Sequence, residues 1–289
     1  MTRKQPCVSS LHILALLVVA TALCAVHCAH AAAAVINTWP FANATRVAFA
    51  ALTASSPQQH LDAITIGCNR CEVEQCDFTV GYGGSPDTNG ETTLDAMILD
   101  GTTMDMGAFA KMMGFQEESL VTPYSRALHA EWKQQQCQPN YFRNVVPAQN
   151  SPDEEQQRVQ ALVTQQNHDT IGMVVLDTKG DMAAGTSSNG ANHKIAGRVG
   201  DAAVPGAGAY VDSAIGGAAA TGDGDVMMRF LPSFHAVQEM AKGAHPRVAC
   251  ERALVRIASK YPHFKGGMVC LNRIGEFGGA GHGWNFSFT

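Results

Sequence analysis

The feature of the sequence that most constrains the fold is an abrupt change of character at Thr170. Residues 144–169, NVVPAQNSPDEEQQRVQALVTQQNHD, are rich in Gln, Glu, Asp, Asn and Pro, a composition typical of an exposed connector with at most a short helix near residues 154–163. From Thr170 the sequence reads TIGMVVLD, an apolar and β-branched run that predicts a strand. A Thr-Lys-Gly turn and the segment DMAAGTSS follow, so the pattern predicts a hairpin.

A threonine at this border has two interpretations. Threonine favours strands, so the simplest one is a β-forming residue at a strand start, and spacing alone favours it. If the bond before Thr170 is cut, however, the threonine becomes a chain terminus that carries its own base. An α-amino group has an ordinary pKa of about 7.7 to 8.0, so a useful neutral fraction can take the hydroxyl proton near neutral pH.

Composition excludes several classes of function. The chain has 289 residues, 46 % of them apolar, which is enough for the core of one large domain. A formal net charge of -5 without a long basic block gives no indication of nucleic acid or an anionic membrane as partner, and favours a small-molecule or protein substrate. The sequence lacks G-x-S-x-G, a Walker loop, H-E-x-x-H, a complete G-x-G-x-x-G and a complete EF-hand loop. No metal and no cofactor is therefore predicted.

The N-terminus has the pattern of a secretory signal peptide. Arg3 and Lys4 precede an apolar run over residues 11–26, and an Ala-x-Ala pattern begins at Ala29. We place the boundary near residue 34. A membrane anchor is the alternative, but the apolar run is short for a span and the cleavage pattern follows it directly.

A secretory route has consequences for cysteine and asparagine. Three cysteines leave with the leader, and disulfides are the default expectation in an oxidising compartment for the remaining six, Cys68, Cys71, Cys76, Cys137, Cys250 and Cys270. The C-x-x-C at residues 68–71 has no second C-x-x-C or matched histidine pair, so a zinc site is not favoured. Asn43 and Asn285 each begin an N-glycosylation sequon.

Periodicity predicts an α+β fold, because the elements follow no regular βαβ rhythm. The glycine-rich residues 198–225 have too little bulk for an ordinary core element and are expected to bring backbone close to another part of the molecule. Strands are predicted over residues 35–38, 94–99, 170–177, 181–188, 267–272 and 284–288, and helices over about 45–55, 60–71, 225–242 and 246–260.

Seven blocks together resemble the glycosylasparaginase family, also called aspartylglucosaminidase. In chain order they are NTWPF, GETTLDAMILDGTTMD, HDTIGMV, GTSSNG, GRVGD, PGAGAY and ATGDGD. The resemblance implies an N-terminal nucleophile hydrolase, a four-layer αββα sandwich made as a precursor that cuts itself between Asp169 and Thr170. The expected products are an α chain, residues 35–169, and a β chain, residues 170–289, which associate in one domain. Whether two such αβ units associate as a dimer is left open by the sequence.

The resemblance also assigns roles to residues of this sequence. The implied substrate is an asparagine whose side-chain amide bears N-acetylglucosamine, with free α-amino and α-carboxyl groups. The implied catalytic residues are Thr170, Ser188, Thr221 and Gly222, and the implied substrate-binding residues are Trp39, Arg198 and Asp201. Ser188 would orient the nucleophile, and Thr221 with Gly222 would form the oxyanion hole. Arg198 would hold the α-carboxylate and Asp201 the α-ammonium. Without the resemblance, Trp39 would be interpreted as a core residue, and Arg198 and Asp201 of GRVGD as members of solvated salt bridges.

The sequence departs from the family in two ways. Family members carry a further helix and strand between the equivalents of Ala108 and Phe109, where this sequence runs straight on. By resemblance, Cys71 pairs with Cys76 and Cys250 with Cys270, whereas Cys137 lacks its partner.

Three functions stay open at this point. The first is a glycosylasparaginase in the secretory pathway and lysosome. The second is a plant-type L-asparaginase or isoaspartyl peptidase with the same terminal-threonine chemistry. The third is a secreted relative that is neither processed nor catalytic.

Overall fold

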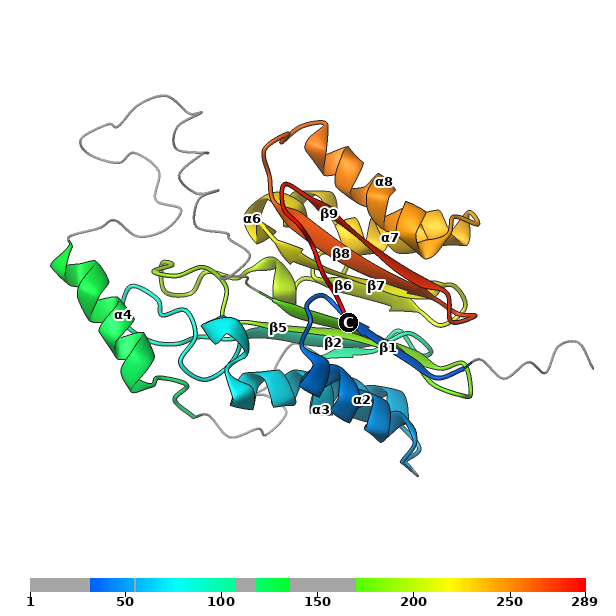
Figure 1. The fold of residues 1–289 in the computed structure, drawn as a ribbon, viewed down its shortest axis with the longest axis horizontal. Helices are drawn as coiled ribbons and strands as arrows, with labels where there is room; N and C mark the ends of the chain where they lie inside the picture. The colour runs from blue at the N-terminus through cyan, green and yellow to red at the C-terminus, as the bar shows by residue number, and fades with distance from the viewer. Residues whose placement is uncertain (1–31, 55, 108–117, 136–169) are drawn as a thin grey trace, which may run out of the picture.

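The computed structural model describes residues 32–54, 56–107, 118–135 and 170–289 (Figure 1). The proposed signal peptide up to residue 31, the short helix expected near residues 154–163, Cys137 and Asp169 lie outside the described residues. The expected leader boundary near residue 34 falls at the start of the first strand, β1, Ala34–Asn37.

A five-stranded antiparallel sheet contains the strand that begins after Thr170. Its order is β1-β4-β5-β2-β3, with β2 at Asp95–Asp100, β3 at Met106–Gly107, β4 at Ile171–Leu176 and β5 at Met182–Ser188. Helices α2, Ala42–Leu52, and α3, Gln59–Glu74, cover one face of this sheet. Every residue of β4 is buried, as its unbroken apolar run predicts for a strand that is covered on both faces.

A four-stranded antiparallel sheet contains the other strands of the described residues. Its order is β6-β7-β8-β9, with β6 at Ala209–Asp212, β7 at Gly216–Gly222, β8 at Gly266–Asn272 and β9 at Phe277–His282. Helices α7, Pro232–Ala241, and α8, Pro246–Ala258, pack on its outer face. The inner faces of the two sheets share one apolar cluster that includes Val174, Val211, Ala219 and Leu271.

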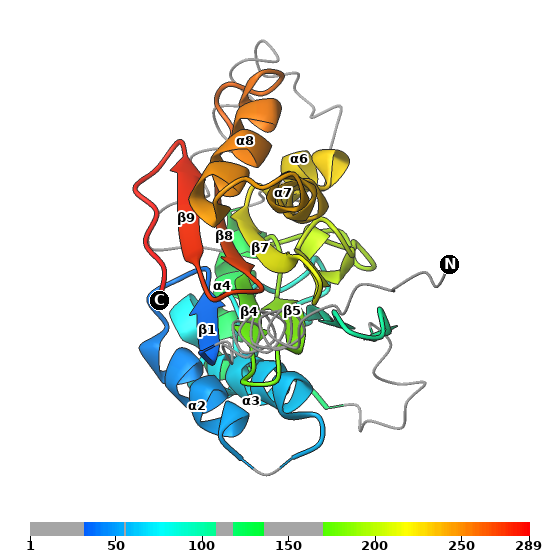
Figure 2. The ribbon, with the colours of Figure 1, turned by 90° about the vertical axis from the view of Figure 1, so that its right-hand side faces the viewer.

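Figures 1 and 2 show the resulting order of layers, with α2 and α3 on one side of the stacked sheets and α7 and α8 on the other. The α+β class that the sequence predicts is confirmed. A further helix, α4 at Pro123–Gln134, begins at a capping box made by Thr122 and Ser125 and was not predicted. The short helices within the described residues are α6, Gly224–Met227, and three 3-10 turns: η1, Cys76–Phe78, η3, Asp201–Ala203, and η4, Met228–Phe230.

The glycine-rich segment gives the main correction to the sequence analysis. It was not expected to form a core element, yet it supplies β6 and β7, and every residue of β7 is buried. Its expected close approach of backbone is confirmed, because a Cβ added at Gly217 would lie 2.5 Å from Val174 Cγ1. Small residues in β7 therefore allow the two sheets to pack closely, and a count of bulky side chains misses a core strand of this kind.

Two predicted elements were wrong. The helix expected over residues 225–242 is interrupted by η4, and α7 begins afresh at Pro232 after Leu231 adopts φ 48°. Pro232 lacks the N–H that a continuous helix requires, and it is tolerated at a first position. The strand expected over residues 284–288 is absent from the described sheets, and β9 lies just before it instead.

Four of the cysteines form the two disulfides that the resemblance implies. Cys71–Cys76 joins α3 to η1, and Cys250–Cys270 joins α8 to β8. Cys68 is a buried free thiol, so the default expectation of a disulfide was wrong there. Burial raises the pKa of the Cys68 thiol, and the nearby Glu72 adds to the shift. This environment keeps the thiol protonated and unreactive.

Two surface features bear on the secretory interpretation. Asn43 in α2 and Asn285 after β9 are both exposed, so both sequons are accessible in the folded chain. None of the helices in the described ranges is long and apolar enough to cross a membrane.

Candidate active site

Thr170 lies immediately before β4 at the end of the sheet where β1 turns into α2. It is 2 % exposed, and its carbonyl oxygen accepts a hydrogen bond from Thr38 Oγ1 at 3.0 Å and another from Trp39 Nε1 at 3.1 Å. The Thr38 hydroxyl in turn accepts the backbone N–H of Gly172 at 3.0 Å. Two residues that follow β1 therefore fix the backbone of Thr170.

Trp39 connects the two sheets. Its Nε1 lies 3.1 Å from the Thr170 carbonyl and 3.2 Å from Thr221 Oγ1, so one N–H is shared between β4 and β7. The ring is 1 % exposed and meets Trp284 and Phe286 edge-on, at centroid distances of 5.3 and 5.5 Å. The ring is therefore a core residue, and its N–H reaches the other implied site residues; the binding of substrate by Trp39 stays a prediction.

Thr221 and Gly222 are the last two residues of β7. Thr221 is fully buried, and Trp39 Nε1 brings its hydroxyl to the Thr170 end of β4. Gly222 has φ 126°, a conformation that side chains rarely adopt, and an added Cβ would lie 2.5 Å from the carbonyl oxygen of Lys265. Only glycine fits there, as is expected where backbone must approach closely.

Ser188 is the last residue of β5. Because β4 pairs with β5 in the register Ile171↔Ser187, Ser188 lies across from Thr170. Its side chain is buried, and Oγ accepts the backbone N–H of Gly190 at 2.9 Å. The sheet register therefore places two hydroxyl-bearing residues side by side.

Arg198 and Asp201 lie beside α6, the short helix that follows Gly222. Arg198 Nη2 donates to Asp225 Oδ1 at 3.0 Å, and these two side chains are 15 % and 23 % exposed. Asp201 is buried, and its Oδ1 would be the nearest contact of a Cβ added at Gly224. The ion pair of Arg198 is thus sheltered and not solvated as the residue pattern alone suggested. The binding of substrate by these two residues stays a prediction.

Asp223 is a site neighbour that neither the motifs nor the resemblance singled out. Burial raises the pKa of the Asp223 carboxyl to about 6, and Asp225 adds to the shift, while the backbone N–H of Val226, Arg229 and Arg198 oppose it. Asp223 follows Gly222 directly, so a titrating group lies next to the glycine of the implied oxyanion hole. Two aspartates within three residues of that glycine were the available signal.

The structure thus gathers most of the implied residues at one end of the stacked sheets. Thr170 and Thr221 are both hydrogen-bonded to Trp39 Nε1, Ser188 lies opposite Thr170 by register, and Gly222 follows Thr221. In this arrangement the Thr170 hydroxyl could act as a nucleophile in acyl transfer, and the Thr221 hydroxyl and the Gly222 N–H could donate to an oxyanion. Asp169, the other side of the expected cut, lies outside the described residues.

Comparison with known proteins gives matches over most of the chain. The family model described as asparaginase matches residues 13–112 and 107–285. The two stretches overlap at residues 107–112, which include the join between Ala108 and Phe109 where the resemblance implies a missing segment.

Three proteins are examples of those with sequences similar to this chain. The N(4)-(Beta-N-acetylglucosaminyl)-L-asparaginase of Rattus norvegicus is 47 % identical over 288 residues, which cover 85 % of this chain and 83 % of the relative. The protein of that name from Mus musculus is 45 % identical over 295 residues, with the same coverage of both chains, 85 % and 83 %. The probable isoaspartyl peptidase/L-asparaginase 3 of Arabidopsis thaliana is 39 % identical over 310 residues, with coverages of 88 % and 86 %.

Proposed function

The chain belongs to the asparaginase family, and we propose that it is a glycosylasparaginase, which hydrolyses the amide bond between N-acetylglucosamine and the side chain of asparagine. The observation that carries the proposal is the position of Thr170. It lies at the buried start of β4, an interior strand of its sheet, with its carbonyl held by Thr38 and Trp39. It is opposite Ser188 and is linked to Thr221 through the indole of Trp39.

Activity first requires the chain to cut itself. We infer that Thr170 Oγ attacks the Asp169 carbonyl carbon, the Asp169–Thr170 amide bond breaks, and the released nitrogen takes the proton, leaving an ester. Water then hydrolyses the ester, which frees a carboxylate on Asp169, the hydroxyl of Thr170 and an α-amino group on Thr170. The products would be an α chain, residues 35–169, and a β chain, residues 170–289. The hydrogen bonds to the Thr170 carbonyl would keep the new terminus in place.

The new amino group then serves as the base. It accepts the proton as Thr170 Oγ attacks the side-chain amide carbon of the substrate, and it returns that proton to the departing glycosylamine nitrogen. The Thr221 hydroxyl and the Gly222 N–H would stabilise the oxyanion, and Ser188 would orient the nucleophile. Water attacks the aspartyl ester and releases aspartate, which regenerates Thr170.

Recognition of the free amino acid is assigned to Arg198 and Asp201. A guanidinium has five N–H donors, and in this structure Nη2 donates to Asp225, which orients the group. The α-carboxylate would bind to Arg198 and the α-ammonium to Asp201, each charge-assisted bond contributing about 1.5 to 3 kcal/mol. Discrimination of this size would distinguish free glycosylated asparagine from the same residue within a peptide.

Further proposals concern architecture and location. We propose that the order of helices and sheets is the αββα sandwich of N-terminal nucleophile hydrolases, in which both chains form one domain. The pairing of β1 with β4 and of β2 with β5 supports this, because each pair joins the segment before the cut to the segment after it. The signal-peptide pattern and the substrate chemistry, a fragment of degraded glycoprotein, support transit through the secretory pathway to the lysosome.

One alternative activity has a specific observation in its favour. The 39 % identical relative from Arabidopsis thaliana is named an isoaspartyl peptidase and L-asparaginase, and the terminal-threonine mechanism suits both substrates. The higher identity to the two relatives named glycosylasparaginase favours the first proposal. Parallel assays on glycosylasparagine, asparagine and a β-aspartyl dipeptide would rank the activities, and higher kcat/KM on the dipeptide would reverse the order.

The self-cleavage proposal predicts the chains found in purified protein. Terminal sequencing should identify a β chain that begins TIGMVV. Thr170→Ala should give one uncut, inactive chain, because the nucleophile is gone. Thr170→Ser should still cut, more slowly, since the hydroxyl remains and the methyl group that restricts its rotamer is lost. Wild-type protein that stays uncut yet hydrolyses glycosylasparagine at full rate would disprove this mechanism, because an internal Thr170 has no free amine. Uncut, inactive wild-type protein would support the non-catalytic alternative.

A further inference from the structure

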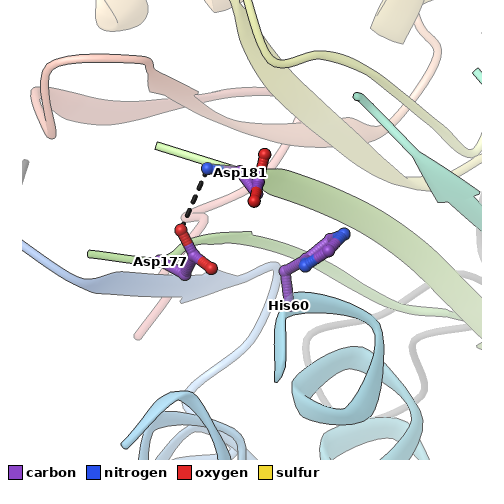
Figure 3. A group of neighbouring side chains, drawn as sticks. All are labelled: His60, Asp177 and Asp181. Carbon is purple, nitrogen blue, oxygen red and sulfur yellow. Dashed lines mark hydrogen bonds between the residues drawn. The ribbon is translucent and has the colours of Figure 1, made fainter. Parts of the chain in front are cut away.

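A second cluster of polar side chains lies at the opposite end of β4 from Thr170. Asp177 directly follows β4 and Asp181 directly precedes β5, so the two aspartates flank the turn of the hairpin. His60 reaches them from the first turn of α3. Figure 3 shows the three side chains near one another, His60 on the helix and the two aspartates on the hairpin. Seven residues of extended chain separate this cluster from Thr170 by roughly 20 Å, so it is distinct from the candidate active site.

The imidazole of His60 is the unusual member. The residue is 6 % exposed, and neither Nδ1 nor Nε2 makes a hydrogen bond within the described part of the chain. Its nearest charged group is Asp100, whose Oδ1 lies 3.5 Å from Nε2. Buried polar groups are normally paired, because an unmade hydrogen bond costs about 1 to 3 kcal/mol. A buried ring that faces acids without a hydrogen bond needs an explanation.

Two of the surrounding carboxylates, those of Asp177 and Asp181, are held in place by hydrogen bonds. Asp177 Oδ1 accepts the backbone N–H groups of Lys179 and Asp181, and its Oδ2 accepts from Gln59 Nε2 at 2.9 Å. Asp181 Oδ1 accepts from Thr102 Oγ1 at 2.8 Å. These bonds orient the oxygens without neutralising them.

Positive charge is scarce around these acids. Among the ion pairs of the described residues, His60 is the single basic partner of Asp100, and no lysine or arginine pairs with Asp177 or Asp181. Three partly or fully buried carboxylates with at most one imidazolium leave a net negative charge in a low-dielectric position. Such a group favours a cation.

We propose that His60, Asp177 and Asp181 bind a divalent transition-metal ion, with zinc as the best match. One ligand atom from each residue lies within 4.8 Å of the others, and the ligands of a tetrahedral zinc ion lie roughly 3.4 Å apart. Side-chain movements of roughly 1 Å would therefore close the site. Imidazole nitrogen with carboxylate oxygen suits zinc, whereas calcium takes six to eight oxygen ligands, which these residues do not supply.

The proposed ion would link separate segments of the protein. His60 belongs to α3, and the two aspartates belong to the β4–β5 hairpin. If the chain is cut before Thr170, the ion joins the α chain to the β chain, and this consequence rests on the proposed function. Metal binding itself does not require the cut. The uncut Thr170→Ala protein should therefore bind zinc as well, which separates a failure of this proposal from a failure of the enzymatic one.

The first test is a zinc titration of chelator-treated full-length protein, followed by calorimetry and by the melting temperature. Wild type should bind one zinc ion per chain, and the melting temperature should rise with zinc and not with calcium. His60→Gln and Asp181→Asn should each weaken the affinity by more than about tenfold and lose the zinc-dependent rise. Asp181 is partly exposed, so its isosteric variant is expected to fold. His263→Gln is the control, since His263 is an exposed histidine outside the cluster.

A second readout uses cobalt as a spectroscopic substitute for zinc. A bound Co²⁺ ion should give a visible absorption band in wild type and in His263→Gln, and no such band in His60→Gln. Absence of zinc binding in wild type would overturn the proposal. Equal zinc affinity in His60→Gln and His263→Gln would also overturn it, because it would mean that surface histidines bind the ion.

Discussion

At the scale of single residues, Trp39 shows how one side chain can serve packing and chemistry together. Its ring is buried against Trp284 and Phe286, while its N–H reaches the carbonyl of Thr170 and the hydroxyl of Thr221. The ring therefore provides rigidity, and the single donor sets the distance between the end of β4 and the end of β7. Substitutions can separate these two roles.

Trp39→Phe keeps an aromatic ring and removes the donor. We expect a loss of about 1 to 3 kcal/mol in unfolding free energy, because two buried acceptors lose a hydrogen bond. Self-cleavage and kcat should also fall, because the Thr170 carbonyl is less well held. Trp284→Phe is the matched control, since the Trp284 indole N–H makes no hydrogen bond within the described residues. Urea unfolding and kcat measurements that do not distinguish the two variants would contradict this role of Nε1.

Asp223 predicts a pH dependence of stability. Its pKa is raised to about 6 from the ordinary value of 3.8, so the folded state binds the proton more tightly than the unfolded state. The charged Asp223 carboxylate therefore lowers the free energy of unfolding. This destabilisation is fully present above pH 6 and disappears as the pH falls from about 6 to about 4. Asp223→Asn, which is never charged, should be more stable than wild type at pH 7, and this advantage should vanish near pH 4.

Thermal unfolding of both proteins across pH 4 to 7.5 would measure this difference. Asp225→Asn is the informative comparison, because Asp225 accepts a hydrogen bond from Arg198. Its loss should lower stability at pH 7, the opposite sign from Asp223→Asn. A pH-independent difference between Asp223→Asn and wild type would mean that Asp223 does not titrate in this range.

At the scale of elements, β4 and β7 pack closely because glycine and alanine residues lie where the two strands meet. A Cβ at Gly172 in β4 would lie 2.8 Å from Ala219 Cβ in β7 and 3.2 Å from Thr38 Cγ2. Such contacts leave no room for a methyl group unless the sheets separate. Glycine is usually unfavourable in a strand, and here close packing of the sheets offsets that disadvantage.

Gly172→Val should destabilise the protein by about 1 to 3 kcal/mol through overpacking. It should also slow self-cleavage, because Gly172 is two residues from Thr170 and its N–H donates to Thr38. Gly107→Ala in the edge strand β3 is the control, since its Cβ would meet Ile98 Cγ2 at an ordinary 3.7 Å. Chemical denaturation should separate the two variants clearly, and equal stabilities would show that the sheets can adjust.

At the scale of the whole molecule, the last residues of the chain pack against its first strand. The backbone of Thr289 exchanges hydrogen bonds with Asn37 at 2.8 and 3.3 Å, and its Oγ1 donates to the Trp39 carbonyl at 3.0 Å. Trp284 and Phe286 contact the Trp39 ring. The tail thus supports the residue that holds Thr170, although the two are far apart in sequence.

Deletion of residues 284–289 should therefore weaken the fold and the site together. Loss of three partly buried aromatic side chains is expected to lower stability by about 2 to 5 kcal/mol, and activity should fall because Trp39 loses its neighbours. Ser287→Thr, at an exposed tail position, keeps the sequon of Asn285 and should change neither property. Melting temperature, tryptophan fluorescence and kcat of the three proteins test this, and a stable, fully active truncated protein would contradict the supporting role of the tail.

The sequence by itself determined the hairpin after Thr170, the helices that became α2, α3 and α8, and the set of candidate residues, because each of these follows from local periodicity or from a contiguous block. Local patterns could not identify β7, since its small residues have no periodic apolar signal and become core only when a second sheet covers them. They also could not bring His60 to Asp177 and Asp181, or Trp39 to Thr170 and Thr221. Those contacts join residues more than a hundred positions apart, and only the register of the strands and the stacking of the two sheets decide which of them meet.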